Sequence, residues 1–184
     1  MNTVQPIRNK TDIAKMKKAL GRDRDRLLFI FGINSALRIS DILKLRVSDV
    51  RGKDFIYLRE GKTGKERKFP INQSIKTAVR QCVSKDAADN EYLFVSRIGN
   101  NKPISRVQAY RILNAAAERC GILEKVGELG THSLRKTWAY HAYKAGVDLT
   151  QVQIALNHDS QADTLRYIGI TQEQTFETFA NINL

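Results

Sequence analysis

Residues 130–146 read GTHSLRKTWAYHAYKAG and combine the features of a helix with those of a reaction site. The run from Ser133 to Lys144 has the composition of a helix, which Gly146 ends. His132 and Arg135 lie three positions apart at its start, so their side chains face the same side. Pairs of this kind are common at helix starts, and the pair by itself indicates no particular function.

The rest of the chain is also mainly helical in pattern. A helix is predicted over residues 11–20, where Thr11 and Asp12 form a cap signal, and another over residues 22–36, which change from charged to apolar. Further helical stretches are predicted at 72–85, 105–120, 149–158, 161–170 and 172–181. The intervening segment 121–132 holds three glycines and is predicted to be a loop.

Two extended runs, residues 54–60 and 65–71, flank the sequence GKTG and predict a β-hairpin. The stretch EGKTGKER (60–67) also looks like part of a nucleotide-binding loop. A Walker A loop requires GxxxxGK[ST] followed by a helix, but here Ile56 or Arg59 takes the place of the first glycine and a strand follows. The sequence therefore favours an exposed basic turn over a nucleotide site.

These patterns predict a mainly α fold with a small antiparallel β-sheet (α+β). The 184 residues suffice for one well-buried core, and neither a repeat nor a linker divides them, so residues 1–184 are predicted to form a single domain. Cys82 and Cys120 lack the spacing of a zinc site or a disulfide framework and are predicted to be packing residues.

The chain is strongly basic, with a formal net charge of +12 and a pI near 9.9. Residues 1–100 hold 22 Lys and Arg against 11 Asp and Glu, whereas residues 101–184 hold 9 against 8. Such a charge predicts an anionic partner, either nucleic acid or a membrane surface. Because no apolar run is long enough to span a bilayer and no signal peptide begins the chain, we expect a cytoplasmic protein with no membrane partner.

Two further stretches hold candidate site residues. ALRISD (36–41) places Arg38 and Asp41 three apart at the head of a short helix, and LNHDSQADTLRY (156–167) places Tyr167 nine residues after His158. With the hairpin and the segment that holds His132, these stretches resemble the catalytic domain of the tyrosine recombinases, the phage integrase family. Six positions match the family pattern in order: Arg38, Lys62, His132, Arg135, His158 and Tyr167.

The resemblance runs from about Thr11 to the end of the chain and implies a site-specific DNA recombinase or integrase of bacterial or phage origin that is associated with the nucleoid. Two other activities stay open: DNA relaxation of the type IB topoisomerase kind, and non-catalytic DNA binding by an accessory protein of the same fold. The family's separate N-terminal DNA-binding domain is not expected in this chain, because only about ten residues (1–10) precede the match. Residues 172–184 would form a C-terminal helix that docks in a neighbouring protomer, so a dimer or tetramer is expected on double-stranded DNA.

The resemblance also implies a role for each matched residue. Arg38 and Arg135 would hold the non-bridging oxygens of a DNA phosphate through bidentate guanidinium donors. Tyr167 would attack the phosphorus, and because its ordinary pKa is about 10 it requires nearby cations or a base. His132 could be that base or a further donor, and His158 would donate to the same phosphate.

The hairpin would supply the proton for the leaving oxygen. Lys62 is the expected donor, with Lys65 as the alternative in the same turn. Lys65, Arg67 and Lys68 are otherwise expected to contact the DNA backbone, and Asp41 to orient part of the cluster. Because the covalent intermediate retains the bond energy, no metal, nucleotide or other small-molecule cofactor is expected.

Other side chains of these types are predicted to be structural. His141 lies nine residues after His132, about two and a half helical turns on, and so faces another side of the helix. Trp138, Tyr140 and Tyr143 on the same helix are predicted to be core aromatics.

Overall fold

The structure is a computed structural model that describes residues 4–62, 64–130 and 132–169. Helices dominate it, and the described residues form one two-stranded sheet. The elements in chain order are α1 (Lys10–Ala19), α2 (Asp23–Ser35), α3 (Ile39–Ile42), the 3₁₀-helix η1 (Val47–Asp49), β1 (Phe55–Arg59), β2 (Glu66–Pro70), α4 (Gln73–Cys82), α5 (Arg106–Arg119), α6 (Leu123–Val126), α7 (Ser133–Lys144), α8 (Leu149–Leu156) and α9 (Gln161–Ile168). The predicted mainly α fold with a small antiparallel sheet is confirmed, while the helix predicted over 172–181 lies outside the described residues.

Two local details differ from the sequence prediction. Helix α1 begins before the predicted cap, because the side-chain oxygen of Asn9 accepts a hydrogen bond from the amide of Thr11 at 2.8 Å. The predicted loop over 121–132 contains the single turn of α6, which Gly127 ends at a φ of 66°. Neither difference moves the candidate site residues to another element.

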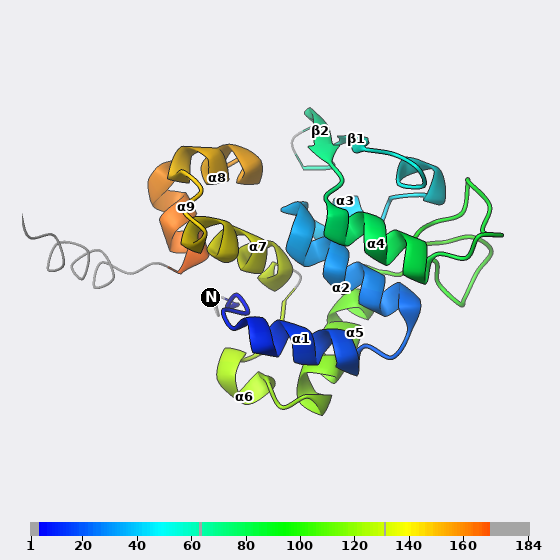
Figure 1. The fold of residues 1–184 in the computed structure, drawn as a ribbon, viewed down its shortest axis with the longest axis horizontal. Coiled ribbons are helices and arrows are strands. Elements are labelled where there is room, and N and C mark those ends of the chain that lie inside the picture. Colours follow the sequence, from blue (N-terminus) through cyan, green and yellow to red (C-terminus); the bar gives the residue numbers. More distant parts are fainter. Residues whose placement is uncertain (1–3, 63, 131, 170–184) are drawn as a thin grey trace, which may run out of the picture.

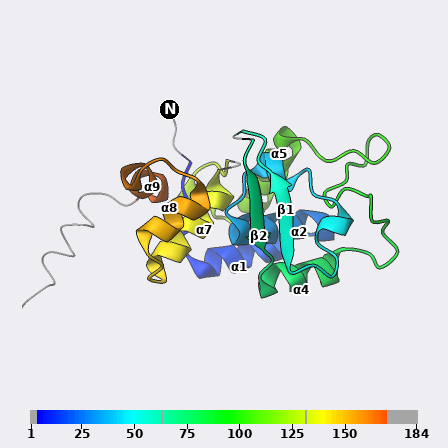
Figure 2. The ribbon, with the colours of Figure 1, turned by 90° about the horizontal axis from the view of Figure 1, so that it is seen from above.

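The elements that carry the candidate residues form two groups (Figure 1). Helices α7, α8 and α9 lie together on one side, and α3 with the β1–β2 ribbon lies on the other. Strands β1 and β2 are antiparallel, with Phe55 opposite Pro70 and Arg59 opposite Glu66, and Figure 2 shows this narrow ribbon from above. Helix α2 connects the two sides, because it packs against both α4 and α7.

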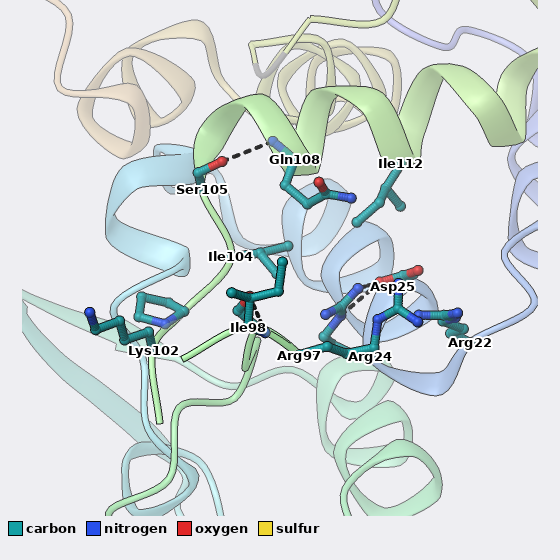
Figure 3. Close-up of a pocket in the computed structure, with 12 residues that line it drawn as sticks. Arg22, Arg24, Asp25, Arg97, Ile98, Lys102, Ile104, Ser105, Gln108 and Ile112 are labelled. Carbon is teal, nitrogen blue, oxygen red and sulfur yellow. Dashed lines mark hydrogen bonds and ion pairs between the residues drawn. The ribbon is translucent and has the colours of Figure 1, made fainter. Parts of the chain in front are cut away.

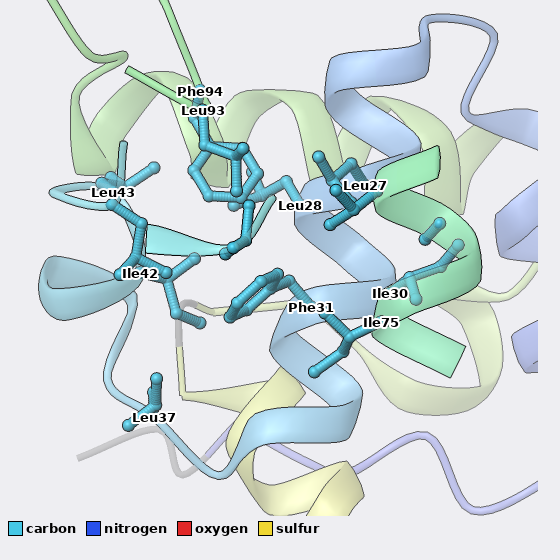
Figure 4. Close-up of a cluster of buried hydrophobic side chains, with 14 of the residues drawn as sticks. Leu27, Leu28, Ile30, Phe31, Leu37, Ile42, Leu43, Ile75, Leu93 and Phe94 are labelled. Carbon is cyan, nitrogen blue, oxygen red and sulfur yellow. The ribbon is translucent and has the colours of Figure 1, made fainter. Parts of the chain in front are cut away.

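The hairpin side is built on an apolar cluster around α2 and α4 (Figure 4). The rings of Phe31 and Phe94 meet edge to face, with centroids 6.2 Å apart. Ile42 of α3 and Ile56 of β1 belong to the same cluster and are almost fully buried. The segment that carries Arg38 and the strand that leads to the lysine turn therefore rest on one core.

The other side has its own apolar cluster. Its buried members come from the end of α2 and from the last three helices: Ala36, Ala139, Val152, Leu156 and Ile168. Trp138, Tyr140 and Tyr143 are partly buried against it, as predicted for core aromatics. This packing fixes α7, α8 and α9 to one another and thereby fixes the spacing of the residues they carry.

The contact between α2 and α7 requires a glycine at position 32. A Cβ there would lie 2.3 Å from Cδ1 and 2.9 Å from Cβ of Leu134. We expect Gly32→Ala to lower the free energy of unfolding by about 1–3 kcal/mol, because the two helices would have to separate. Urea denaturation measures the change.

The matched control for this substitution is Gly21→Ala. A Cβ at position 21 meets no atom within 4 Å, and this glycine does not have a positive φ. The control should therefore be as stable as the parent protein. A Gly32→Ala protein with unchanged stability would contradict the close approach of α2 and α7.

Candidate active site

A cavity of about 300 Å³ lies where the hairpin, the start of α7 and the end of α9 meet. All six residues that match the family pattern line it, although they are spread over 130 positions of the chain: Arg38, Lys62, His132, Arg135, His158 and Tyr167. Asn157, Asp159 and Asp163 complete its wall. The fold thus brings together every side chain to which the sequence assigned a step in the reaction.

Two residues in the left-handed region redirect the chain just before site residues. Ala36 has a φ of 52° and ends α2 two positions before Arg38, and Asn157 has a φ of 50° and ends α8 directly before His158. This conformation is unfavourable for alanine by about 1–2 kcal/mol, whereas asparagine tolerates it better. After each turn the next site residue, Arg38 or His158, lines the cavity.

Tyr167 lies between the two histidines of the cavity. Its hydroxyl is 3.4 Å from Nδ1 of His132, and its ring meets the ring of His158 edge to face at a centroid distance of 4.9 Å. Catalytic hydrogen bonds are often long in the absence of substrate and shorten when it binds. The distance therefore suits a proton transfer from the Tyr167 hydroxyl to Nδ1 of His132.

Lys136 is a site neighbour that the sequence interpretation missed. It is only 6% exposed, and its Nζ lies 5.0 Å from the centre of the Tyr167 ring. Burial lowers the pKa of this lysine. Its position four residues after His132 places it on the same helical face, which is the signal that could have identified it.

The Tyr167 hydroxyl is neutral at physiological pH, because burial raises its pKa to about 12. The charges of Arg135 and Arg38 act in the opposite direction but do not outweigh burial. The sequence argument allowed cations alone to activate the tyrosine. A raised pKa favours a proton acceptor beside these cations.

His132 is suited to accept that proton. Desolvation of its ring, together with the charges of Arg135 and Lys136, lowers its pKa below the ordinary value of 6.5. The imidazole is therefore neutral at pH 7 and has a lone pair available for the tyrosine proton. Of the two roles left open for His132, this geometry favours the base.

His158 is also neutral at pH 7, since desolvation and the charge of Arg135 lower its pKa. Its Nδ1 lies 3.2 Å from Oγ1 of Thr164, and that hydroxyl donates its own hydrogen to the carbonyl of Ser160 at 3.0 Å. The hydroxyl must then accept from Nδ1, so the proton of neutral His158 is on Nδ1. Nε2 can donate to a phosphate only after it gains a proton, which a bound phosphate anion favours.

Arg135 is held at the base of the cavity with part of its guanidinium unused. It is 3% exposed, and its Nη2 donates to the carbonyl of Leu156. Its Nη1 is buried and has no hydrogen-bond partner among the described residues. A buried donor without a partner is costly, and an anion in the cavity would satisfy it.

Arg38 is held by a carboxylate that the sequence interpretation did not single out. Its Nη1 donates to Oε2 of Glu60 at 2.6 Å, and Nη1 of Arg67 donates to Oε1 of the same carboxylate at 2.8 Å. Glu60 is only 1% exposed. Arg67 was expected to contact the DNA backbone, but its guanidinium is directed into the protein, where Nη2 also donates to the carbonyl of Ala155.

The hairpin turn places Lys62, but not Lys65, in the wall of the cavity. Gly64 has a φ of 68°, and its amide donates to the carbonyl of Glu60 at 2.8 Å, which closes the turn. Oδ1 of Asp41 accepts from the amide of Gly61 at 3.1 Å. Among the described residues, Asp41 therefore accepts a hydrogen bond from the backbone beside the lysine and none from a site side chain.

Lys68 of β2 is exposed, and its Nζ lies 4.0 Å from the centre of the Phe55 ring. His141 is directed away from the cavity, with Nε2 3.0 Å from the carbonyl oxygen of Ile7. Lys68 thus remains available on the surface, and His141 takes the structural position predicted for it.

A larger cavity, of about 530 Å³, lies between the starts of α2 and α5 (Figure 3). Arg22, Arg97 and Lys102 line it, together with Arg24, whose charge is paired with Asp25 at 2.7 Å. No histidine or tyrosine lines it, so it lacks the pairing of tyrosine and histidine that the smaller cavity has. Within the described residues there is no metal-binding group of three or more His, Cys, Asp or Glu, and no helix long and apolar enough to cross a membrane.

Comparison with known proteins matches residues 9–174 to the family described as the phage integrase family. The chain belongs to this family. It is 50% identical over 177 residues to the "Probable integrase/recombinase YoeC" of Bacillus subtilis (strain 168), a match that covers 95% of this chain and 94% of that protein. It is 30% identical to the "Tyrosine recombinase XerA" of Pyrococcus furiosus, where the match covers 94% of this chain and 60% of the relative. The domain is thus that of a tyrosine recombinase.

Solved structures have the same fold. The crystal structure of XerA recombinase superposes with a TM-score of 0.79 at 21% identity, covering 99% of this chain and 68% of that one. A lambda integrase dimer bound to a COC' core site superposes with a TM-score of 0.71 at 20% identity, covering 91% of this chain and 61% of that one. The tyrosine recombinase fold expected from the sequence is therefore confirmed.

Proposed function

We propose that the protein is a site-specific DNA recombinase that breaks and rejoins strands through a 3'-phosphotyrosyl link to Tyr167. The observation that carries the proposal is the Tyr167 hydroxyl 3.4 Å from Nδ1 of His132, in a cavity that Arg38, Arg135 and Lys62 also line. The named relatives are integrases and recombinases, which favours this activity over the two alternatives.

The arginines stabilise the phosphate during attack. Negative charge increases on the non-bridging oxygens as the fifth bond to phosphorus forms, and guanidinium groups fixed in advance meet that charge. Arg135 offers its unpaired Nη1, and Arg38 offers the donors that Glu60 does not use. Loss of one such donor costs about 3–4 kcal/mol of transition-state stabilisation.

The strand is cleaved by exchange of one phosphoester for another. Tyr167 Oη attacks the phosphorus while its proton passes to Nδ1 of His132. The bond from phosphorus to the 5'-oxygen breaks, and Nζ of Lys62 protonates that oxygen, because an alkoxide is a poor leaving group. The products are a 3'-phosphotyrosyl link and a free 5'-hydroxyl. A 5'-hydroxyl from another strand reverses the steps and releases the tyrosine.

We further propose that double-stranded DNA approaches the hairpin side of the cavity. Lys62, Lys65 and Lys68 are all exposed there and would contact the phosphate backbone, and the first hundred residues carry most of the basic excess. Assembly of two or four protomers would bring the second 5'-hydroxyl to the site. The related lambda integrase structure is a dimer bound to a COC' core site, which supports assembly here too.

Covalent capture tests the proposal. The protein is incubated with duplexes tiled across the DNA that flanks its gene, each carrying a nick beside a candidate cleavage position so that the short 5'-hydroxyl fragment diffuses away. We expect one or a few duplexes to yield a protein–DNA adduct that survives denaturation. Relaxation of supercoiled plasmid without any specific duplex being captured would instead favour the topoisomerase alternative.

The pH dependence of adduct formation tests the role of His132. If neutral His132 accepts the proton, the rate should be nearly constant from about pH 7 to 8.5 and should fall as the pH drops below the lowered pKa of this histidine, where the ring is charged. If Tyr167 had to ionise first, its pKa of about 12 would make the rate rise about tenfold per pH unit over the same range. Single-turnover rates at saturating DNA distinguish the two profiles.

A further inference from the structure

Glu60 is a buried charge at the border of the active site that the reaction scheme does not use. Its carboxylate is 1% exposed, and it comes directly after β1, two residues before Lys62. A buried carboxylate is costly unless it is paired, and pairs of this kind contribute little net stability. Its position between two arginines therefore requires an explanation other than stability.

The contacts of Glu60 join three separate elements. Oε2 accepts from Arg38, which precedes α3, and Oε1 accepts from Arg67 of β2. Nδ2 of Asn157, the residue that ends α8, lies 3.5 Å from Oε2. Through these contacts the first arginine of the site, the lysine hairpin and the residue before His158 share one carboxylate.

Arg67 extends this connection to the end of α8. Its second amino group donates to the carbonyl of Ala155 at 2.9 Å, and Arg135 donates to the next carbonyl, that of Leu156. The last carbonyls of a helix lack partners within the helix and must find them elsewhere. Two arginines thus satisfy the end of α8, directly before the left-handed Asn157 and before His158.

We propose that Glu60 and Arg67 are positioning residues that fix Arg38 and the turn at 155–158 in the geometry the reaction requires. Glu60 holds one amino group of Arg38 and leaves its other donors directed at the phosphate. Arg67 anchors the turn that carries His158 to the hairpin that carries Lys62. Neither residue lines the cavity, so both act through the side chains they hold. The inference on catalysis rests on the proposed function, but the inference on the turn does not.

The first test uses the free protein. Hydrogen exchange is measured at the amides of Asn157 and His158, which donate to the carbonyls of Ile154 and Gln153. In Arg67→Met these two amides should exchange at least about tenfold faster than in the parent protein. The exchange rates of the α4 amides should not change, because only the turn loses its contact with Arg67. The matched control is Glu66→Gln in the same hairpin, where the pair with Arg59 is exposed and should contribute little. Unchanged exchange at the turn in Arg67→Met would overturn the proposed anchor.

The second test uses the nicked duplex that the parent protein captures. Glu60→Gln keeps the shape of the side chain and removes its charge. We expect the single-turnover rate to fall roughly tenfold or more while the Kd for the duplex changes less than about threefold, because orientation and not attraction is lost. The single-turnover rate of the double variant Glu60→Gln/Arg67→Met should be little lower than that of the slower single variant. Both substitutions break the same contact between Glu60 and Arg67, so their effects should not add.

A neutral substrate separates positioning from a general structural role. In a duplex with a single methylphosphonate at the cleavage position, the phosphate lacks the charge that Arg38 meets. The rate deficit of Glu60→Gln should then shrink, as should that of Arg38→Ala. An equal deficit on both duplexes, a lowered Tm with rate and affinity falling together, or a faster Glu60→Gln protein would each overturn the role in catalysis. Absence of any adduct with the parent protein would refute the proposed function, and the exchange experiment would still decide the role of Arg67 at the turn.

Discussion

Tyr167→Phe is expected to abolish formation of the covalent adduct, with a loss of at least about 10⁴-fold, because Tyr167 carries the only hydroxyl among the described residues that line the cavity. The adduct is measured as a band of reduced mobility on a denaturing gel after incubation with the nicked duplex. Tyr167 lies in the cavity beside His132 and His158, whereas Tyr140 and Tyr143 pack against the apolar cluster of α7, α8 and α9. Removal of the other hydroxyls should therefore leave the reaction intact.

The control for Tyr167→Phe is Tyr143→Phe, which removes a hydroxyl from α7 outside the cavity. Folding is checked separately, since the Tyr167 ring packs partly against the apolar cluster of α7, α8 and α9, and the phenylalanine ring retains that packing. DNA affinity should change less than about threefold, because the arginines that meet the phosphate are untouched. An adduct that persists in Tyr167→Phe would refute this tyrosine as the nucleophile.

The parts of the site that the sequence predicted are those fixed by local pattern. His132 and Arg135 share a helical face because of their spacing, and Tyr167 follows His158 at a distance set by a turn and one short helix. The resemblance to the tyrosine recombinases then added Lys62 to the same site. Composition alone had indicated only that this lysine lies in an exposed basic turn. The structure brings all of them to one cavity.

The parts that the sequence did not predict depend on contacts between distant segments. Glu60 looks like a polar residue at a strand end, and only its approach to Arg38, 22 positions earlier, makes it a buried counterion. In the sequence Arg67 looks like one more cation of a basic hairpin. Only the structure shows that it donates to the carbonyl of Ala155, 88 positions later. The pKa of Tyr167 likewise depends on how deeply it is buried, and no local pattern contains that quantity.

Lys62→Ala is expected to slow strand cleavage by about 10²–10⁴-fold, the range that a positioned proton donor contributes. The structure places this lysine in the wall of the cavity. Two hydrogen bonds hold its turn, one from the amide of Gly61 to Asp41 and one from the amide of Gly64 to the carbonyl of Glu60. A donor is required because the 5'-oxygen leaves as a strongly basic alkoxide. The lysine should matter only as long as that oxygen is the leaving atom.

A 5'-bridging phosphorothiolate gives the sharpest test of this role. Sulfur leaves as a thiolate without protonation, since a thiol has a pKa of about 8.5, so Lys62→Ala should regain most of the parent rate on that duplex. Arg135→Ala should remain slow on both duplexes, because it stabilises the non-bridging oxygens, which are unchanged. Lys65→Ala is the matched control: as a proposed backbone contact it should lower the affinity for DNA, but at saturating DNA its cleavage rate should be close to the parent rate on both duplexes. If the phosphorothiolate restored the cleavage rate of Lys65→Ala and not that of Lys62→Ala, the proton donor of the hairpin would be Lys65. The assignment of Lys62 from its place in the cavity wall would then be wrong.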